Sequence, residues 1–356
     1  MIIEIPDGED FARASLNLLN LSWEIAVEFL RAYEHSSVIH PEDAPTELFT
    51  DLEGKVHLLG GPDNAFTPEE RSTAETEFWR RSQPSLGNSL SLIQQSIELG
   101  LKGRIAAVSP FLLISRDARD YPSGSAKADV PFSAFRSLDA ADLMRVHNTV
   151  CAERLDDSFG AWWDSIRRQR NALIHSVSLG AEIVRPEVLM GHILVANRDL
   201  HPGISWFQRR LRYSSNNEIQ VAYHPDPREI YGGVLDEFGD ALHYLPTKMV
   251  REHFGYNRRA RTYTCIHCQD DCDNDLWYEW NLGKTAQLNP GNSTSTIWRC
   301  VLCERVTPVI RVRCPDEKCH SNVLSAELGD HYKICLTCGE EWGLSEEQDE
   351  ALDAGD

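Results

Sequence analysis

Hydrophobic residues recur at helical spacing in three long stretches of the chain. Residues 14–34 carry one apolar stripe, residues 86–105 carry a second, and residues 161–180 carry a third. In the first two stretches the apolar residues are mostly three or four positions apart: Leu16, Leu19, Trp23, Ala26, Val27 and Leu30, then Leu86, Leu90, Ile93, Ile97, Leu101 and Ile105. This period predicts helices that each bury one face in a core.

Two further helices are predicted between these stretches. Thr67 and Pro68 form a good helix start, and Glu70 completes a capping box, so a separate surface helix is expected to run to about Arg81. Residues 137–150 begin with a serine that is expected to cap the next helix.

Proline and glycine interrupt the helical pattern in residues 35–68 and 115–136. These residues predict loops, with a short hairpin around residues 55–59 in the first of them. Helices that alternate with short and medium connections predict a bundle. The first 180 residues are therefore expected to form a domain of about five helices.

The third stretch combines a buried stripe with polar side chains. The apolar positions that predict its inward face are Trp162, Ile166, Leu173 and Val177. Asn171 and His175 are four residues apart and share one face of the helix, and the side chain of Arg170 is long enough to reach them. The stretch thus presents an Arg-Asn-x-x-x-His unit.

These three groups suit the cleavage of RNA without a metal ion. An imidazole can take or give a proton near pH 7, and a guanidinium matches a phosphate that gains charge in a transition state. The amide of Asn171 can orient either group, and the 2′-OH of RNA supplies the nucleophile. We therefore predict His175 as general acid and base, Arg170 as phosphate ligand and Asn171 as orienting residue. The alternative is a solvated helix face or a salt-bridge network at a dimer interface.

The hexamer Arg170-Asn171-Ala172-Leu173-Ile174-His175 resembles the signature of HEPN domains, helical domains found in many prokaryotic ribonucleases, toxins and antiviral defence proteins. The upstream stretch LSLIQQSIELGLKGRIAAV is similar to an earlier core helix of such domains. The resemblance covers about the first half of the chain. It implies a homodimer in which two motifs form one active site, and a product that ends in a 2′,3′-cyclic phosphate.

Residues 181–260 are a mixed connecting region in the sequence. Residues 191–196 and 218–223 are candidate strands, and residues 233–254 predict a pair of helices broken near Pro246. The region either extends the bundle or bridges to the part that follows.

The cysteines in the C-terminal part of the chain are spaced as metal ligands usually are. Nine of the ten cysteines lie between residues 265 and 338, and a chain without a secretory signal uses such clusters for metal rather than for disulfides. The predicted ligands are Cys265, Cys268, Cys300 and Cys303, then Cys314, Cys319, Cys335 and Cys338.

Four thiolates with no open position form a structural site that favours Zn²⁺ over iron. We therefore predict two zinc ions per chain, held in small β modules of the zinc-ribbon kind within residues 261–345. Each pair of neighbouring cysteines forms one knuckle that supplies two thiolates. We assume that consecutive knuckles share a zinc ion, and an interleaved arrangement of the knuckles would use the same eight residues. Cys272 is either a free thiol or a substitute ligand, and three histidines are further alternatives: His267, His320 and His331.

The formal charge of −20 argues against a protein that coats nucleic acid indiscriminately. RNA binding would need local basic patches, and we predict one at Arg167 and Arg168. Two others combine arginines with aromatic residues that could stack on unpaired bases: Arg209, Arg210 and Arg212 beside Trp206, Phe207 and Tyr213, then Arg258, Arg259 and Arg261 between Tyr256 and Tyr263. The alternative is that these arginines only solvate amphipathic helices.

The sequence therefore predicts a mainly α-helical bundle in residues 1–180, the connecting region 181–260, two C-terminal zinc modules and an acidic, disordered tail at 346–356. Without a leader or a membrane span, the protein is expected in the cytoplasm. The first functional hypothesis is a dimeric endoribonuclease that binds RNA or a protein partner through its zinc modules. The second is a non-catalytic adaptor or nucleic-acid-binding scaffold, and a DNA-binding regulator is the third.

Overall fold

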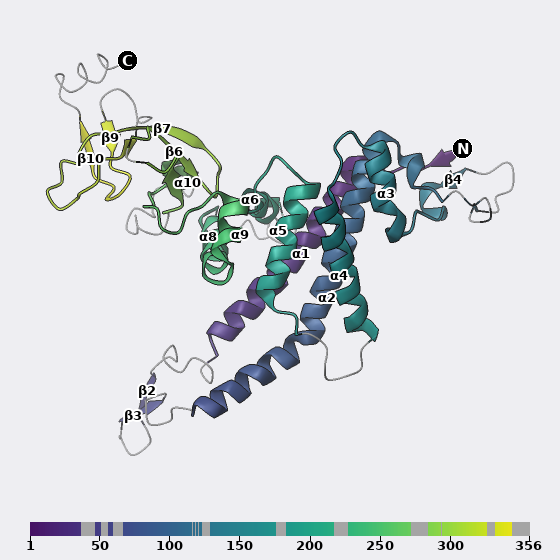
Figure 1. Ribbon diagram of the computed structural model, residues 1–356. Helices are drawn as coiled ribbons and strands as arrows, with labels where there is room; N and C mark the ends of the chain where they lie inside the picture. The colour runs from purple at the N-terminus through teal and green to yellow at the C-terminus, as the bar shows by residue number, and fades with distance from the viewer. Residues whose placement is uncertain are drawn as a thin grey trace, which may run out of the picture. The chain divides into compact units, whose positions relative to one another are not determined.

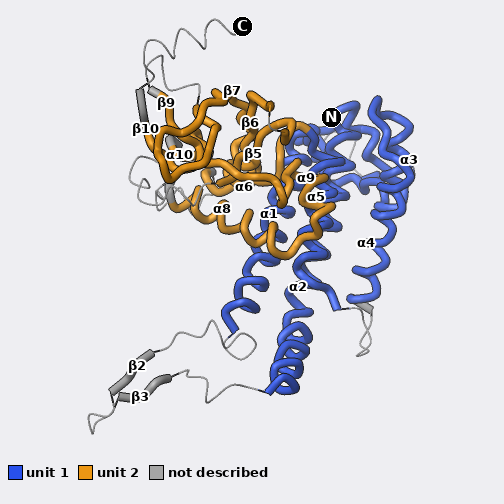
Figure 2. The backbone as a smooth tube through the Cα atoms, turned by 60° about the vertical axis from the view of Figure 1, so that its left-hand side comes forward, with its two compact units in different colours: residues 1–202 blue, residues 203–356 orange. Residues whose placement is uncertain are grey.

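The computed structural model of the chain describes residues 1–36, 47–50, 56–59, 67–115, 117, 119, 121–122, 129–175, 183–216, 227–271, 284–292, 294–325 and 332–343. Helices dominate, and a small antiparallel sheet lies near the C-terminal end (Figure 1). The chain divides into two compact units, residues 1–202 and 203–356, which Figure 2 colours separately. Among the described helices, none combines the length and the apolar character that a membrane span requires.

Two long helices form the centre of the first unit. Helix α1 (Gly8–Glu34) begins with a capping box between Asp7 and Asp10, and α2 (Pro68–Val108) begins with the predicted box at Thr67. The two helices run side by side (Figure 1). Gly8 and Gly103 let their backbones approach. The predicted apolar stripes of both helices are buried except at Leu16, which is half-buried.

Helix α2 corrects one prediction, because a single helix of 41 residues replaces the two that were expected on either side of residue 81. Pro84 lies inside it, although proline removes one backbone hydrogen bond and usually breaks a helix. Side chains on both sides of Pro84 are anchored. Trp79 is buried, with its ring centroid 4.9 Å from that of Tyr33, and Leu86 is fully buried. Tertiary packing on both sides of Pro84 therefore keeps the helix continuous across it.

Shorter elements complete the first unit. Two are 3₁₀ helices, η3 (Pro110–Leu113) and η5 (Phe132–Ala134), and strand β1 (Ile2–Ile3) pairs in parallel with β4 (Val130–Pro131). The predicted hairpin is confirmed as antiparallel strands β2 (Glu47–Thr50) and β3 (Val56–Leu59).

Helices α3 (Ala140–Val150), α4 (Asp157–His175) and α5 (Pro186–Leu200) pack against α2 (Figure 1). Helix α3 starts three residues later than predicted, because the backbone around Ser137 instead pairs with the segment after α2, where the N–H of Leu138 donates to the carbonyl of Leu113 at 2.8 Å. Residues 191–196, predicted as a strand, lie inside α5. A short apolar run has the same pattern in a buried helix and in a buried strand, and here the run is buried by α1 and α2.

In the second unit three helices precede the sheet: α6 (Trp206–Asn216), α8 (Pro227–Tyr244) and α9 (Thr247–Phe254). The predicted break near Pro246 is confirmed, while the candidate strand 218–223 lies outside the described residues. Phe207, Phe238 and Phe254 form an aromatic core whose ring centroids are 4.9–6.4 Å apart.

The β part of this unit follows a short helix, α10 (Ile266–Asp271). Its strands form an antiparallel sheet in the order β5 (Ala286–Leu288), β6 (Ile297–Cys300), β7 (Val306–Ile310) and β8 (Leu324–Ser325). A separate hairpin pairs β9 (Tyr332–Ile334) with β10 (Glu341–Gly343). The predicted tail 346–356 lies outside the described residues.

Candidate metal centres and the motif on α4

The first group of four cysteines joins two knuckles of the second unit. Cys265 precedes α10 and Cys268 lies in its first turn, while Cys300 ends β6 and Cys303 lies in the turn that follows. The Sγ atoms of Cys265 and Cys303 are 3.6 Å apart, and those of Cys268 and Cys300 are 3.7 Å apart. A zinc–thiolate bond of about 2.3 Å gives a tetrahedron with an edge of about 3.8 Å. The four sulfurs therefore fit a zinc ion.

The second group has the same geometry. The Sγ atoms of Cys314 and Cys338 are 3.7 Å apart, and those of Cys319 and Cys335 are 3.8 Å apart. In each group all four sulfurs lie within 4.8 Å of one another. Each site uses two consecutive knuckles, so the pairing is sequential and not interleaved. The described cysteines form no disulfide, and the two groups are positioned to hold two zinc ions.

Hydrogen bonds from the backbone orient the sulfurs. The N–H of Cys268 donates to Cys265 Sγ at 3.4 Å, and the N–H groups of Thr337 and Cys338 donate to Cys335. A tight knuckle brings these N–H groups toward the sulfur of the preceding cysteine. Such bonds stabilise the thiolate form that binds a metal.

A cation is needed for all four sulfurs of either group to be thiolates together. Burial raises the pKa of the Cys314 thiol to about 11, and it also raises the pKa of Cys265. These thiols would stay protonated at pH 7 without a positive charge beside them. A divalent ion supplies that charge and releases the protons, and four sulfur ligands leave no position for water. Both sites are therefore structural.

The alternative ligands do not enter either group among the described residues. The ring nitrogen Nε2 of His267 instead lies 2.9 Å from the hydroxyl of Thr307. Cys151 belongs to the first unit, far along the chain from both sites, and it is a free thiol. Cys272 and His331 lie outside the described residues.

Helix α4 turns Trp163 inward in place of the predicted Trp162, while Ile166 is buried as predicted and Val177 lies outside the described residues. Phe159, Trp163 and Ile166 are buried, whereas Trp162 is only half-buried and its Nε1 donates to His192 Nδ1 at 3.1 Å. Continuing the inward stripe by four residues leads from Ile166 to Arg170. The correction therefore concerns the motif itself, because Arg170 extends the buried face of the helix.

Arg170 and Asn171 form a hydrogen-bonded pair. Nη1 of Arg170 donates to Oδ1 of Asn171 at 3.1 Å. Arg170 is half-buried and its Nε has no hydrogen-bond partner, while Asn171 is exposed. The Nε end of the guanidinium is thus buried, and Nη1 is oriented by an amide that faces solvent. The backbone of α4 continues to His175, whose side chain lies outside the described part of the chain.

The predicted patch at Arg167 and Arg168 lies on the preceding turn of α4. Arg167 pairs with Asp164 at 3.3 Å and lies over the ring of Trp163, with its guanidinium carbon 5.9 Å from the ring centroid. Arg168 is exposed, and its Nε donates to the carbonyl of Asp164 at 3.3 Å. Arg168 therefore offers the freer positive charge next to the motif.

The two predicted patches of arginine and aromatic residues do not present rings for stacking. Trp206 and Phe207 are buried in the aromatic core, and Tyr256 and Tyr263 are buried as well. Tyr213 is half-buried, with the guanidinium of Arg210 5.3 Å from its centroid. Phe207 and Tyr256 instead pack against Phe238 in the core of the helical part, with ring centroids 5.2 Å and 5.3 Å away. The stacking prediction is wrong for them.

A narrow apolar groove of about 270 Å³ borders α4 beside the motif. Ala172 and Leu173 of the motif line one side, and Leu90, Ile183 and Val188 line the others. Ile183 and Val188 are 45% and 44% exposed, which is unusual for aliphatic side chains that lie this close together. Sequence reasoning missed this groove, because its walls come from segments that are far apart along the chain.

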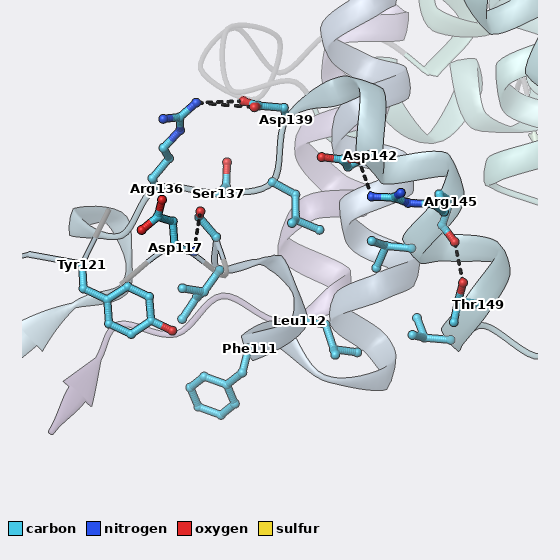
Figure 3. A pocket seen from close by; sticks show the side chains of 15 residues that line it. Phe111, Leu112, Asp117, Tyr121, Arg136, Ser137, Asp139, Asp142, Arg145 and Thr149 are labelled. Carbon is cyan, nitrogen blue, oxygen red and sulfur yellow. Dashed lines mark hydrogen bonds and ion pairs between the residues drawn. The ribbon is translucent and has the colours of Figure 1, made fainter. Parts of the chain in front are cut away.

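A wider cavity of about 610 Å³ lies between η3, α3 and the segment that precedes α3 (Figure 3). Four of its five charged lining residues form two ion pairs within the lining, and the fifth, Asp117, pairs with Arg119 at 2.6 Å outside it. Arg136 faces Asp139 at 3.4 Å and Arg145 faces Asp142 at 2.8 Å. No nucleophile in it is paired with a base among the described residues, so we assign no chemistry to it.

Comparisons of the chain with protein-family models, with curated proteins and with solved structures give no match.

Proposed function

We propose that the protein is a metal-independent endoribonuclease of HEPN type. The observation that carries the proposal is the Arg170–Asn171 pair on α4, which lies one turn before His175 on the same uninterrupted helix. An oriented guanidinium next to an exposed amide is an arrangement that can hold a phosphate. A role in a toxin or in phage defence is what the resemblance implies for such an enzyme.

In the proposed reaction His175 removes the proton of an RNA 2′-OH, and this oxygen attacks the adjacent phosphorus. A bond forms between O2′ and phosphorus, and the bond to the 5′-oxygen of the next nucleotide breaks. That oxygen takes up a proton, and a second imidazole can supply it. The products are a 2′,3′-cyclic phosphate and a 5′-hydroxyl. Arg170 stabilises the charge that develops on the phosphate, and Asn171 holds Arg170 in position.

A second imidazole comes most simply from a second copy of the chain. The apolar groove lies next to the motif, and the exposed aliphatic side chains of Ile183 and Val188 border it. We place the contact between two copies there, so that burial of these side chains brings the two motifs together. Arg167 and Arg168 would flank the RNA strand on the neighbouring turn.

The test compares purified wild-type protein with His175→Ala and Arg170→Ala on single-stranded RNA. Loss of a general acid or base should slow cleavage by about 100-fold or more. The wild-type products should carry cyclic phosphates, RNA with 2′-O-methyl groups should not be cut, and activity should survive EDTA while bound zinc is retained. Arg145→Gln removes an exposed arginine of α3 that pairs with Asp142 and should leave cleavage unchanged. Equal cleavage by wild type and His175→Ala would exclude His175 from the mechanism.

The second candidate function is a nucleic-acid-binding scaffold without catalysis. The charge of the sheet segment 284–325 favours it, since this segment contains six Lys and Arg and only three Asp and Glu in a chain of net charge −20. RNA binding without cleavage by the wild-type protein would support this function. A protein partner bound through the zinc modules is a further form of the same scaffold.

A further inference from the structure

A small pocket in the second unit lies between the end of α9 and the β5–β6 hairpin. It has a volume of about 230 Å³, below the size of a site for a drug-like ligand, and suits one small planar group. Twelve residues line it, and none of them is acidic. Arg299 is the one charged residue of the lining.

The pocket is built by backbone features that leave room beside Arg299. Gly255 adopts a left-handed conformation with a φ of +66°, and a Cβ at this position would lie 3.1 Å from Arg299 Nη1. A side chain there would occupy the space that the guanidinium uses. Nη1 of Arg299 thus lies beside the backbone of Gly255, which has no side chain. Nη2 of Arg299 pairs with Glu304 at 2.9 Å.

One wall of the pocket is a rigid amide frame. The N–H of Asn257 donates to Oε1 of Gln287 at 2.8 Å, and Nε2 of Gln287 donates back to the carbonyl of Asn257 at 2.7 Å. The lining also includes Asn289, whose side-chain amide makes no hydrogen bond to any described residue. Asn289 can therefore donate and accept at the mouth of a pocket whose shape is already fixed.

The first zinc site supports the floor of this pocket. Thr285 lines the pocket, and its hydroxyl lies 3.2 Å from Cys300 Sγ. Val301, the residue after that cysteine, lines the pocket too. A zinc ion held by the first group of cysteines would therefore stabilise this side of the pocket through Cys300 without entering it.

We propose that this pocket binds one unpaired nucleotide of single-stranded RNA. The amide of Asn289 would pair with an edge of the base, and the guanidinium of Arg299 would contact the adjacent phosphate. Nearby exposed charges favour a polyanion, since residues 255–267 contain three arginines and no acidic residue. Five acidic residues between positions 270 and 279 limit non-specific attraction, so the pocket rather than the overall charge sets the affinity. The inference extends the proposed function, with which it shares RNA as ligand.

The test measures binding to the full-length, zinc-loaded protein that carries His175→Ala, so that no probe is cut. The probes are fluorescent homopolymers of A, C and U of about twelve nucleotides, within the range that single-strand-binding modules occupy, with the matching DNA strands. Gly291 lines the pocket, and the nearest neighbour of an added Cβ would be 3.7 Å away, so this position has room for the first atom of a side chain and Gly291→Leu is chosen to obstruct the pocket. Gly291→Leu and Asn289→Leu should each weaken binding of the preferred RNA by about fivefold or more and reduce the difference between bases.

Two matched controls separate the pocket from general effects. Gly239→Leu adds the same side chain on α8, where nothing lies within 4 Å, and should not change RNA binding. Arg313→Gln removes an exposed charge outside the pocket and should weaken binding of all bases equally. Arg299→Gln, by contrast, should weaken binding more strongly than Arg313→Gln.

Three results would overturn the proposal: no RNA binding by the parent protein, unchanged affinity and base preference in both leucine variants with intact zinc content, or equal affinity for RNA and DNA. The failure of the nuclease proposal would instead appear as a lack of cleavage, which this binding measurement does not use.

Discussion

Arg210 on α6 and Glu237 on α8 form a buried ion pair in the second unit, with N–O distances of 2.9 Å and 2.7 Å. Their side chains are 3% and 12% exposed, so both charges are removed from water. The two oxygens of the carboxylate match the planar fork of the guanidinium. The pair therefore links α6 to α8 beside the contact between the rings of Phe207 and Phe238, whose centroids are 5.2 Å apart.

We expect Glu237→Gln to lower the free energy of unfolding of this unit by about 3–5 kcal/mol, because it leaves a buried guanidinium without its counter-charge. Arg210→Met combined with Glu237→Leu should recover most of that loss, since it removes both charges together. The control is Asp142→Asn in the exposed Arg145–Asp142 pair, which should change stability by less than about 1 kcal/mol. Chemical denaturation of each variant measures these differences. Similar losses for the buried and the exposed pair would contradict the expectation.

His192 should make the first unit less stable in mild acid. Burial lowers the pKa of His192 to about 4, and its Nδ1 accepts the hydrogen bond from Trp162 in the neutral form. The unfolded chain binds a proton with a pKa of about 6.5, so stability is complete above that pH and falls between about 6.5 and 4. The expected loss from this residue is about 2 kcal/mol at pH 5.

His192→Leu should remove that part of the pH dependence. Burial also lowers the pKa of His147, which contributes a loss of the same sign. The measurement is therefore the fall in unfolding temperature from pH 7 to pH 5, compared between wild type and His192→Leu. An equal drop in both proteins would show that His192 does not titrate as expected.

Metal analysis should give two zinc ions per chain, one for each group of four cysteines. Cys300→Ser and Cys319→Ser should each reduce the zinc content to about one, because three thiolates hold the ion much less tightly than four. Cys151→Ser is the matched control and should leave the zinc content unchanged. A content of two in Cys300→Ser would mean that another residue replaces this ligand.

Loss of zinc should unfold the sheet and leave the first unit helical. The sheet buries few apolar side chains of its own, whereas α1 and α2 share a long apolar interface. Chelation at pH 7, followed by circular dichroism and limited proteolysis, would measure this difference. Loss of helix signal in parallel with zinc release would contradict it.

The contact between α1 and α2 depends on glycine at two facing positions. A Cβ at Gly103 would lie 3.0 Å from the carbonyl oxygen of Gly8, and a Cβ at Gly8 would lie 2.8 Å from that of Gly103. Gly103→Ala should therefore lower stability by about 1–3 kcal/mol, despite its better helix propensity, because backbone cannot move aside as a side chain can. Gly239→Ala has open space and should raise stability by about 0.5–1 kcal/mol. Unfolding temperatures of both variants test the contrast.

The candidate site was predicted in part. The spacing of the cysteines identified all eight metal ligands, since each knuckle holds its two thiolates at short range along the chain. The hexamer on α4 was placed on a helix correctly, but the sequence assigned Trp162 rather than Trp163 to the inward face. Adjacent residues on a helix differ by about 100° in direction, and two neighbouring tryptophans are equally apolar. Only the packing partners of α4 distinguish them.

The sequence by itself determined where helices begin at strong caps, which stripes are apolar, and which cysteines can bind zinc, because these features depend on neighbours within a few residues. The tertiary structure decided that α2 continues through Pro84, that residues 191–196 are helical, and that the knuckles pair in sequence. It also decided that the aromatic residues beside the arginines are buried and that Asn289 and Arg299 border one pocket. Each of these features depends on contacts between residues far apart in the chain, and local periodicity contains no information about such contacts.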